Sequence, residues 1–585
     1  MTKEAYQAAL AALQSTISGK TRSAPKTKNE LTWDEQFERL RLYLDRLGMT
    51  DDLDKLSVIH VAGTKGKGST CAFVEHILRE NNVKTGLYSS PHLVDVRERF
   101  RVNGAPVSKQ TFTKEFWWLF NGCKTKCKDL GGAPAYFRFL TLLGFRIFEQ
   151  EKVGCAILEV GLGGRLDATN LVRHPTVCGV TSLGMDHVEV LGDTIAKIAT
   201  EKAGIFKPRV PAFTSPQPFD AMEALQVRAD YVGAKLDTAP PLRSYSRDAS
   251  GPNADDIKLG LAGQHQKLNA ALAVRLVREW AFQTRPAWGP AVERDLSSGE
   301  LPETFRAGLA KTQWWGRAQV VADTFEGLTD ENNDSTDTKE SDSSLVWYLD
   351  GAHTEESMAQ CAEWFCEASK WPEGEETVIE TMTETATQTE GETANDATQD
   401  TQADAAVDGD SVLQEDLKLK PPPPQPLRLF LFNCMEERDP LTLLTPLAKA
   451  LSDRKTPLTH PAYFAPSESS AKGLVPDTQE HVDLRWQQKM AGTWDDLVRK
   501  HPGSYISSEG DAGVVPENAP AAGDSNTPPI PTSLAASVPS LRLAVEKIRS
   551  VALEQRRLRT GRRVHVLVAG SLYLVGDMLR VLGRA

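Results

Sequence analysis

A glycine-rich turn with two lysines follows a buried apolar segment, residues 58–61, and precedes a helical stretch. Its sequence is Gly63-Thr64-Lys65-Gly66-Lys67-Gly68-Ser69-Thr70. In such a strand–turn–helix unit, backbone N–H groups and the positive end of the helix point at an anion. Lys67 would supply charge to the β- and γ-phosphates of a nucleotide, and Ser69 or Thr70 a hydroxyl near a metal. Gly68 departs from the GxxxxGK[ST] spacing, but a turn without a ligand does not explain the two lysines.

Further polar side chains follow later segments of the same pattern. Glu159 lies in the apolar segment 155–160, His187 follows 177–181, and Lys202 lies one helix further on. Open α/β sheets bind ligands at the carboxyl ends of their strands. Glu159 could bind Mg²⁺, a hard cation that takes oxygen ligands, although a single strand-end glutamate is more often structural. The recurrence of these residues after successive strands predicts that they share one edge of a sheet.

The elements that would position these residues predict an α/β fold with two domains. Near-continuous apolar segments alternate with amphipathic ones, which is typical of a mostly parallel sheet covered on both faces. The segments of the first domain are 58–61, 85–88, 155–160 and 177–181. Those of a second, smaller α/β domain are 318–321, 345–349, 427–432 and 564–568. We assign residues 1–310 to a P-loop domain and 311–585 to the second domain.

Three polar stretches interrupt the second domain, at about 323–344, 373–424 and 510–531. The part from 373 to 416 holds 14 acidic residues and no Lys, Arg, Phe, Trp or Tyr. Such stretches cannot bury enough apolar surface to offset the entropy of ordering. We expect them to be disordered surface insertions.

Composition excludes several classes of function. The 585 residues include 67 Lys and Arg against 79 Asp and Glu, a net charge of −12, which disfavours bulk binding to nucleic acid or anionic membrane. The eight cysteines are scattered without a CxxC pair, which argues against a disulfide scaffold or a zinc site. No apolar run reaches the ~18 residues of a membrane span. We expect a soluble, monomeric protein of the cytoplasm, with a mitochondrial pool as a further location.

Together the motifs resemble those of the folylpolyglutamate synthases, in the Mur-ligase superfamily of ATP-dependent amide-bond ligases. The matching stretches occur in family order between residues 57 and 576, and only the insertions fall outside. They are 63–70, 89–93 with 97–99, 159–170, 186–192, 201–207, 265–269, 314–317, 350–353 and 569–573. The resemblance implies a P-loop ATPase domain and a C-terminal Mur-ligase-type domain. Lys65 stands where bacterial relatives commonly have Asn, as in eukaryotic members.

The resemblance also implies roles for individual residues. The turn from Gly63 to Thr70 would hold the ATP phosphates, with Lys67 acting in catalysis. Lys202 matches a lysine that the family carbamylates, and His353 a catalytic residue near the reacting groups. Residues 89–99 resemble a loop that closes over the folate. The expected nucleotide-binding residues elsewhere are Asn269, Arg317 and Asp350, and those of two Mg²⁺ sites are Ser90, Glu159 and His187.

The implied reaction joins L-glutamate to a reduced folate. The γ-phosphoryl group of ATP would pass to the terminal carboxylate of tetrahydrofolate or its polyglutamates, and the glutamate amine would displace phosphate. Mg²⁺ and a monovalent cation such as K⁺ are the implied cofactors. Three alternatives stay open: a dihydrofolate synthase, a P-loop kinase or switch GTPase, and a non-catalytic binding protein. Gly68 and the lack of a base-reading motif disfavour the kinase or GTPase, and the complete set of expected residues disfavours the last alternative.

Overall fold

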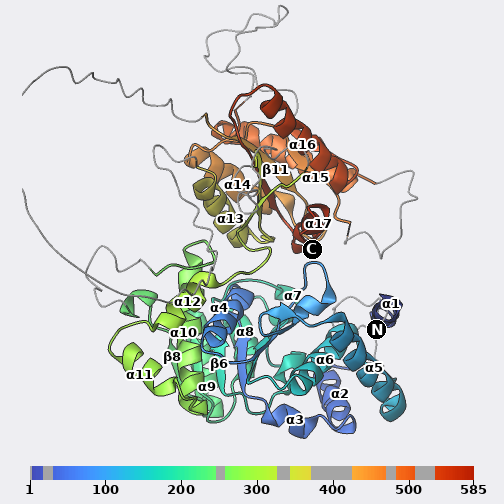
Figure 1. Ribbon diagram of the computed structural model, residues 1–585, viewed down its shortest axis with the longest axis vertical. Coiled ribbons are helices and arrows are strands. Elements are labelled where there is room, and N and C mark those ends of the chain that lie inside the picture. The colour runs from blue at the N-terminus through green and yellow to red at the C-terminus, as the bar shows by residue number, and fades with distance from the viewer. Residues whose placement is uncertain are drawn as a thin grey trace, which may run out of the picture.

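The computed structural model describes residues 3–17, 31–245, 257–325, 343–370, 424–468, 483–506 and 534–584. These residues form two α/β domains, which lie one above the other in Figure 1. The predicted fold class is therefore confirmed. Apart from their edges, the expected insertions 323–344, 373–424 and 510–531 lie outside the described residues. Within the described part of the chain, none of the helices combines the length and apolarity that a membrane crossing requires.

The first domain contains an eight-stranded, mostly parallel sheet among the described residues, with β1 near its centre. The four strands predicted for it are confirmed, while the antiparallel edge pair β3 and β4 was not foreseen. In order across the sheet, the strands are β4 (Ala105–Pro106), β3 (Phe100–Val102), β2 (Thr85–Tyr88), β5 (Cys155–Glu159), β1 (Val58–Ala62), β6 (Val177–Val180), β7 (Ala212–Thr214) and β8 (Leu236–Thr238).

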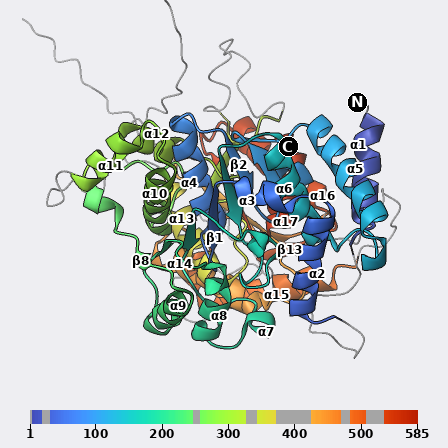
Figure 2. The ribbon, with the colours of Figure 1, turned by 90° about the horizontal axis from the view of Figure 1, so that it is seen from below.

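Helices cover both faces of this sheet (Figure 2). Successive side chains of a strand point to opposite faces, so Ile59 packs with α4 and α10 while Val58 packs with α5 and α6. The helices of the domain are α1 (Lys3–Gln14), α2 (Trp33–Arg46), α3 (Thr50–Lys55), α4 (Lys67–Glu80), α5 (Lys109–Lys126), α6 (Tyr136–Gln150), α7 (Val188–Leu191), α8 (Ile195–Lys202), α9 (Phe219–Val232), α10 (His265–Thr284), α11 (Gly289–Ser297) and α12 (Glu303–Lys311).

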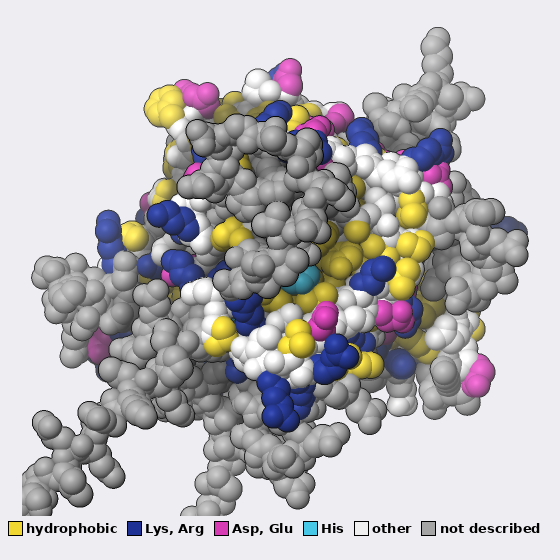
Figure 3. Space-filling view, turned by 90° about the horizontal axis from the view of Figure 1, so that it is seen from above, with side chains coloured by type: hydrophobic (Ala, Val, Ile, Leu, Met, Phe, Trp, Pro, Cys, Tyr) yellow, Lys and Arg dark blue, Asp and Glu magenta, His cyan; other side chains and the backbone are white. Residues whose placement is uncertain are grey.

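The second domain is built around a six-stranded sheet in the described residues, parallel except for the edge strand β9. In order, its strands are β13 (Ala535–Ser537), β12 (Ala462–Phe464), β11 (Leu427–Phe432), β14 (Val564–Ala569), β10 (Leu345–Leu349) and β9 (Gln319–Ala322). One face packs against α13 (Glu355–Ala368), α14 (Pro440–Asp453) and α15 (Arg485–Lys500), and the other against α16 (Leu541–Arg557) and α17 (Leu572–Val581). On the coloured part of the face in Figure 3, basic, acidic and hydrophobic side chains intermingle.

Both ends of the expected 323–344 insertion belong to this second domain. Asp323 is 1% exposed, accepts a hydrogen bond from Trp347 Nε1 (3.0 Å) and pairs with Nε and Nη2 of Arg549 (2.9 and 3.0 Å). Ser343 is also buried, and its hydroxyl donates to the carbonyl of Asp323 (2.8 Å). A guanidinium partner lets the chain bury a carboxylate that composition alone assigned to the surface.

Candidate active site

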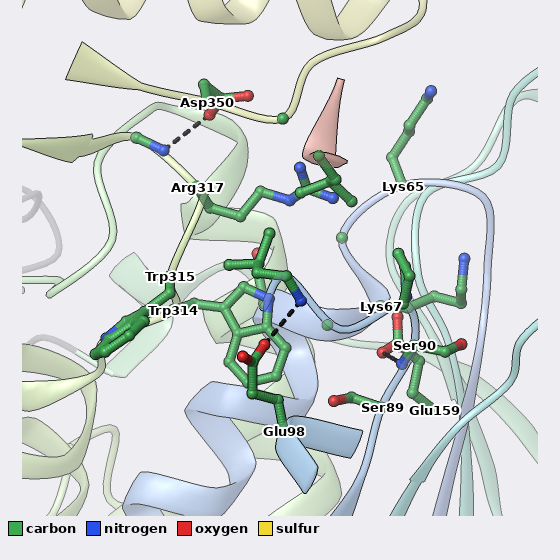
Figure 4. A pocket seen from close by; sticks show the side chains of 18 of the residues that line it. Lys65, Lys67, Ser89, Ser90, Glu98, Glu159, Trp314, Trp315, Arg317 and Asp350 are labelled. Atoms are coloured by element: carbon green, nitrogen blue, oxygen red, sulfur yellow. Dashed lines mark hydrogen bonds between the residues drawn. The ribbon is translucent and has the colours of Figure 1, made fainter. Parts of the chain in front are cut away.

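A cavity of about 860 Å³ lies between the two domains and is lined by residues of both. Figure 4 shows Lys67, Ser90 and Glu159 on one side of it and Arg317 and Asp350 on the other. The cavity collects most of the site residues expected from the sequence. Those that line it are Thr64, Lys65, Gly66, Lys67, Gly68, Ser69, Ser90, Glu159, His187, Asn269, Arg317, Asp350 and His353. Gly63, Thr70 and Lys202 are not among the lining residues.

The glycines of the turn between β1 and α4 are required by close packing. Gly63 has φ +147°, and a Cβ there would lie 1.8 Å from Thr181 Oγ1. Gly66 has φ +84°, and its Cβ would lie 2.0 Å from the side-chain oxygen of Asn269. Side chains at these positions would displace the residues behind the turn. The turn therefore presents its backbone and Lys67 at the start of α4, which suits a phosphate ligand.

Two lysine ammonium groups converge on the carbonyl of Gly63. Lys67 Nζ donates to it at 3.1 Å, and Lys202 Nζ, from the last residue of α8, donates at 2.8 Å. Burial, followed by the positive charge of Lys67, lowers the pKa of Lys202 to about 7. Lys202 thus lies behind the turn and reaches its neutral form near neutral pH. A neutral amine is the form that can react with CO₂.

The expected metal-binding residues come from three separate segments: Glu159 from the end of β5, and Ser90 and His187 from loops. Glu159, at the end of β5, is 5% exposed and accepts a hydrogen bond from the backbone N–H of Ser90 (3.1 Å). Burial raises the pKa of Glu159, and the charge of Lys67 opposes that rise. His187 immediately precedes α7 and has φ +52°, and its Nε2 lies 3.9 Å from a carboxylate oxygen of Asp186. Carboxylate and hydroxyl oxygens fit Mg²⁺, which usually completes its shell with water and substrate oxygens.

These residues do not amount to a preformed metal cage. Over the described ranges, no three or more His, Cys, Asp and Glu side chains group closely enough to hold an ion. A cation at Glu159 would therefore depend on oxygen atoms brought by the substrates, as is common for Mg²⁺ in nucleotide-dependent enzymes.

The wall formed by the second domain holds its polar groups in fixed orientations. The Asp350 carboxylate accepts from the backbone N–H groups of Ala318 (2.8 Å) and Ala352 (2.9 Å). Burial raises the pKa of Asp350, and Arg317 opposes that rise. His353 Nδ1 lies 2.8 Å from the carbonyl of Gly351, and burial lowers the pKa of His353 to about 4. A neutral His353 that donates through Nδ1 has Nε2 free to act as an acceptor.

Residues 89–99, termed the 89–99 loop, directly follow β2, and most of them line the cavity. The Glu98 carboxylate accepts from the backbone N–H groups of Leu93 (2.7 Å), Val94 (3.0 Å) and Asp95 (2.7 Å), which closes the loop on itself. From helix α1, the Tyr6 hydroxyl donates to Asp95 at 2.7 Å. Sequence reasoning identified the loop but not Tyr6, because a single tyrosine on a helix carries no signal of its partner.

Comparison with known proteins identifies the family to which the chain belongs. It is 37% identical to a folylpolyglutamate synthase of Arabidopsis thaliana over 99% of this chain and 87% of the relative. A second Arabidopsis folylpolyglutamate synthase is 39% identical over 99% and 89% of the two chains. The chain belongs to the folylpolyglutamate synthase family. The human mitochondrial folylpolyglutamate synthase is 46% identical over 57% of this chain and 55% of its own. No family model matches the chain.

Solved structures of folylpolyglutamate synthases share this fold across both domains. The Mycobacterium tuberculosis enzyme complexed with ADP and AMPPCP has a TM-score of 0.62 at 18% identity and covers 99% of each chain. The apo enzyme of L. casei has a TM-score of 0.59 at 18% identity, also over 99% of each chain. At this level of identity the likeness establishes the fold.

In this member of the family, the two domains also touch through polar contacts that the sequence did not reveal. Lys65 Nζ, in the glycine-rich turn, donates to Thr354 Oγ1 at the start of α13 (2.6 Å). The Asp186 carboxylate lies 3.9 Å from the guanidinium of Arg438. Both pairs depend on how the domains dock, so neither sequence motif indicates its partner.

Proposed function

We propose that this chain is an ATP-dependent ligase that adds L-glutamate to the γ-carboxylate of tetrahydrofolate and of its polyglutamates. The observation that supports this function best is the facing arrangement across the cavity. The glycine-rich turn with Lys67 lies on the first domain, and Arg317, Asp350 and His353 lie on the second. Membership of the folylpolyglutamate synthase family supplies the substrate class.

Activation of the carboxylate requires charge neutralisation and alignment more than covalent help from the protein. Lys67 and Arg317 would neutralise the transferring phosphoryl group from opposite domains. Gly63 to Thr70, Asn269 and Asp350 would hold the nucleotide. The product of this step is an acyl phosphate, which hydrolyses in water, so a cavity closed by both domains protects it.

Attack by the glutamate amine then forms the amide and releases phosphate. His353 would orient the incoming amine through Nε2, because its Nδ1 is directed at the carbonyl of Gly351. We place the boundary between the P-loop domain (1–310) and the second domain (311–585) in the last turn of α12, so that each domain contributes one wall of the site.

We assign magnesium binding to Ser90, Glu159 and His187, in two sites, and a carbamate to Lys202. Bound Mg²⁺ would stabilise the negative charge of the phosphate oxygens. A carbamate would turn the Lys202 ammonium into a carboxylate-like group beside the turn. We further propose that a monovalent cation such as K⁺ supports the reaction. Replacing K⁺ by Na⁺, and titrating Mg²⁺, would test the two cation assignments.

The decisive assay uses the purified protein with ATP, Mg²⁺ and labelled L-glutamate. Tetrahydrofolate as acceptor should take up the label, whereas dihydropteroate should not. Incorporation into dihydropteroate alone would assign the chain to dihydrofolate synthase, and phosphate release without amide formation would contradict ligation. We also propose that the chain is a monomer, and gel filtration would test this.

We also propose a cytoplasmic location with a mitochondrial pool, which is supported by relatives named as mitochondrial in cattle and humans. Cell fractionation with an antibody to the chain would test both locations.

A further inference from the structure

The 89–99 loop belongs to the first domain but packs on the last helix of the second. Leu93 and Val94 pack against the apolar cluster that contains Val575 and Met578 of α17. Leu93 also approaches Gly316, in the segment that links α12 to β9. The loop thus contacts the second domain and lines the cavity at once, with Leu93 and Val94 taking part in both.

Gly576 makes this close packing possible. A Cβ built on Gly576 would lie 2.1 Å from the carbonyl oxygen of Leu93, 2.9 Å from its carbonyl carbon and 3.4 Å from its Cα. All three of these nearest atoms belong to the other domain. Glycine in a helix interior is less favourable than alanine, and the fold of α17 itself does not require it. The requirement comes from the loop.

Arg580 fixes the loop from the next turn of α17. One branch of its guanidinium pairs with the buried Asp577 (2.7 Å), and the other donates to the carbonyl of Val94 (2.9 Å). Asp577 is fully buried and also accepts from Ser467. The arginine is therefore held by its own domain in the position that reaches the loop.

We propose that Gly576 and Arg580 are positioning residues for the folate. Through them, α17 holds the 89–99 loop in the conformation that binds the substrate. This inference rests on the proposed function. When the second domain docks on the first, α17 holds the loop in place, and the start of the same helix, at Leu572, lines the cavity. Docking of the domains and the shape of the folate side of the cavity are thereby one event.

The chain offers a matched control for each residue. Gly492 is also a glycine inside a helix of the second domain, but a Cβ there meets nothing within 4 Å. Arg499 pairs with Asp496 three residues before it, as Arg580 pairs with Asp577, and is exposed on the same helix as Gly492. A lysine at position 580 would keep the charge that pairs with Asp577, but it lacks the two separated nitrogens with which the guanidinium reaches Asp577 and Val94 at the same time.

The experiment compares Gly576→Ala with Gly492→Ala, and Arg580→Lys with Arg499→Lys, in the full chain. We expect Gly576→Ala to raise the KM for tetrahydrofolate about tenfold or more while kcat falls less than about threefold, because substrate positioning is lost and the chemistry is retained. Arg580→Lys should raise that KM about threefold, the effect of one hydrogen bond. Both controls should match the parent protein.

Amide hydrogen exchange gives a readout that does not need the enzyme to be active. Exchange across residues 89–99 should accelerate in Gly576→Ala and not in Gly492→Ala. If the parent protein ligates no glutamate, the proposed function fails. Hydrogen exchange alone then decides whether α17 holds the 89–99 loop. Unchanged exchange in Gly576→Ala, or a KM equal to that of Gly492→Ala, would overturn the proposal. If Gly576→Ala does not melt cooperatively, Arg580→Lys with its control decides in the same way.

Discussion

At the scale of single residues, the carbonyl of Gly63 organises the charge of the site. Lys67 and Lys202 both donate to it, one from the start of α4 and one from the end of α8. Two ammonium groups on one acceptor repel each other, and the repulsion contributes to the low pKa of Lys202. The arrangement favours anions that can separate the two charges, such as a phosphate in front of the turn and a carbamate behind it.

Substitution of Lys67 tests the phosphate half of this arrangement. Lys67→Ala should lower kcat by about 10²–10³ or more, because a charge aimed at the transferring phosphoryl group is lost. The melting temperature should change little, since Lys67 lines a cavity and is not part of a core cluster. Lys55→Ala, an exposed lysine on α3, is the control. Turnover near the parent rate in Lys67→Ala would remove the P-loop assignment.

The pKa of about 7 for Lys202 predicts how carbamylation depends on pH. CO₂ reacts with the neutral amine, so enzyme stripped of CO₂ should regain activity much faster at pH 8 than at pH 6 when both solutions hold the same concentration of dissolved CO₂. In the stripped protein, the folded state binds fewer protons at Lys202 than the unfolded state between pH 7 and 10.5. The free energy of unfolding should therefore rise with pH across that window.

The modification itself is checked by substitution. Lys202→Ala should be inactive and partly rescued by short carboxylic acids, which replace the missing carbamate oxygens. Recovery at equal rates at both pH values, or full activity of Lys202→Ala, would contradict the carbamate.

At the scale of elements, the ion pair between Asp323 and Arg549 joins the segment just after β9 to α16. Asp323→Ala should lower the free energy of unfolding of the second domain by about 3–5 kcal/mol, because it leaves a largely buried guanidinium without its partner. Chemical denaturation followed by tryptophan fluorescence suits this test, since Trp347 donates to the same carboxylate. Asp453→Ala, an exposed residue at the end of α14, is the control. A loss no larger than that of the control would show that the pair is not structural.

The elements that sequence patterns predicted are those whose own residues determine burial. β5 and β14 are fully buried along their length, so a nearly continuous apolar run, interrupted only by Glu159 and His565, marks them. β3 and β4 have three and two residues, and their partners define them. Such short strands carry no periodicity of their own.

The candidate site divides in the same way. Glu159 and His187 were expected at one sheet edge because Glu159 lies at the end of a strand and His187 follows one, and both line the cavity. Lys202 also ends an element beside that edge, yet its side chain reaches the turn from behind. Contacts such as Lys65 with Thr354 depend on domain docking, which no local pattern encodes.

At the scale of the whole molecule, we predict that the acidic segment 373–416 is dispensable for catalysis. α13 ends at Ala368, the described chain resumes at Pro424, and β11 begins at Leu427. Replacing residues 373–416 with a short Gly/Ser linker should keep kcat and the KM for ATP within about twofold, because the cost of loop closure grows slowly with length. Steady-state kinetics checks this. A tenfold loss in a variant that still melts cooperatively would assign the segment a part in function.

The order of strands in the second sheet has a consequence for how the chain reaches its native state. β14 lies between β10 and β11, yet it is encoded more than 100 residues after either of them. During synthesis, β10 and β11 wait without their shared neighbour until residue 569 has left the ribosome. Their apolar side chains, such as Trp347 and Phe430, are exposed to wrong partners in that interval. Pairings across such long separations form slowly, so the P-loop domain matures first and the second domain is the step at which a cell gains most from chaperone assistance.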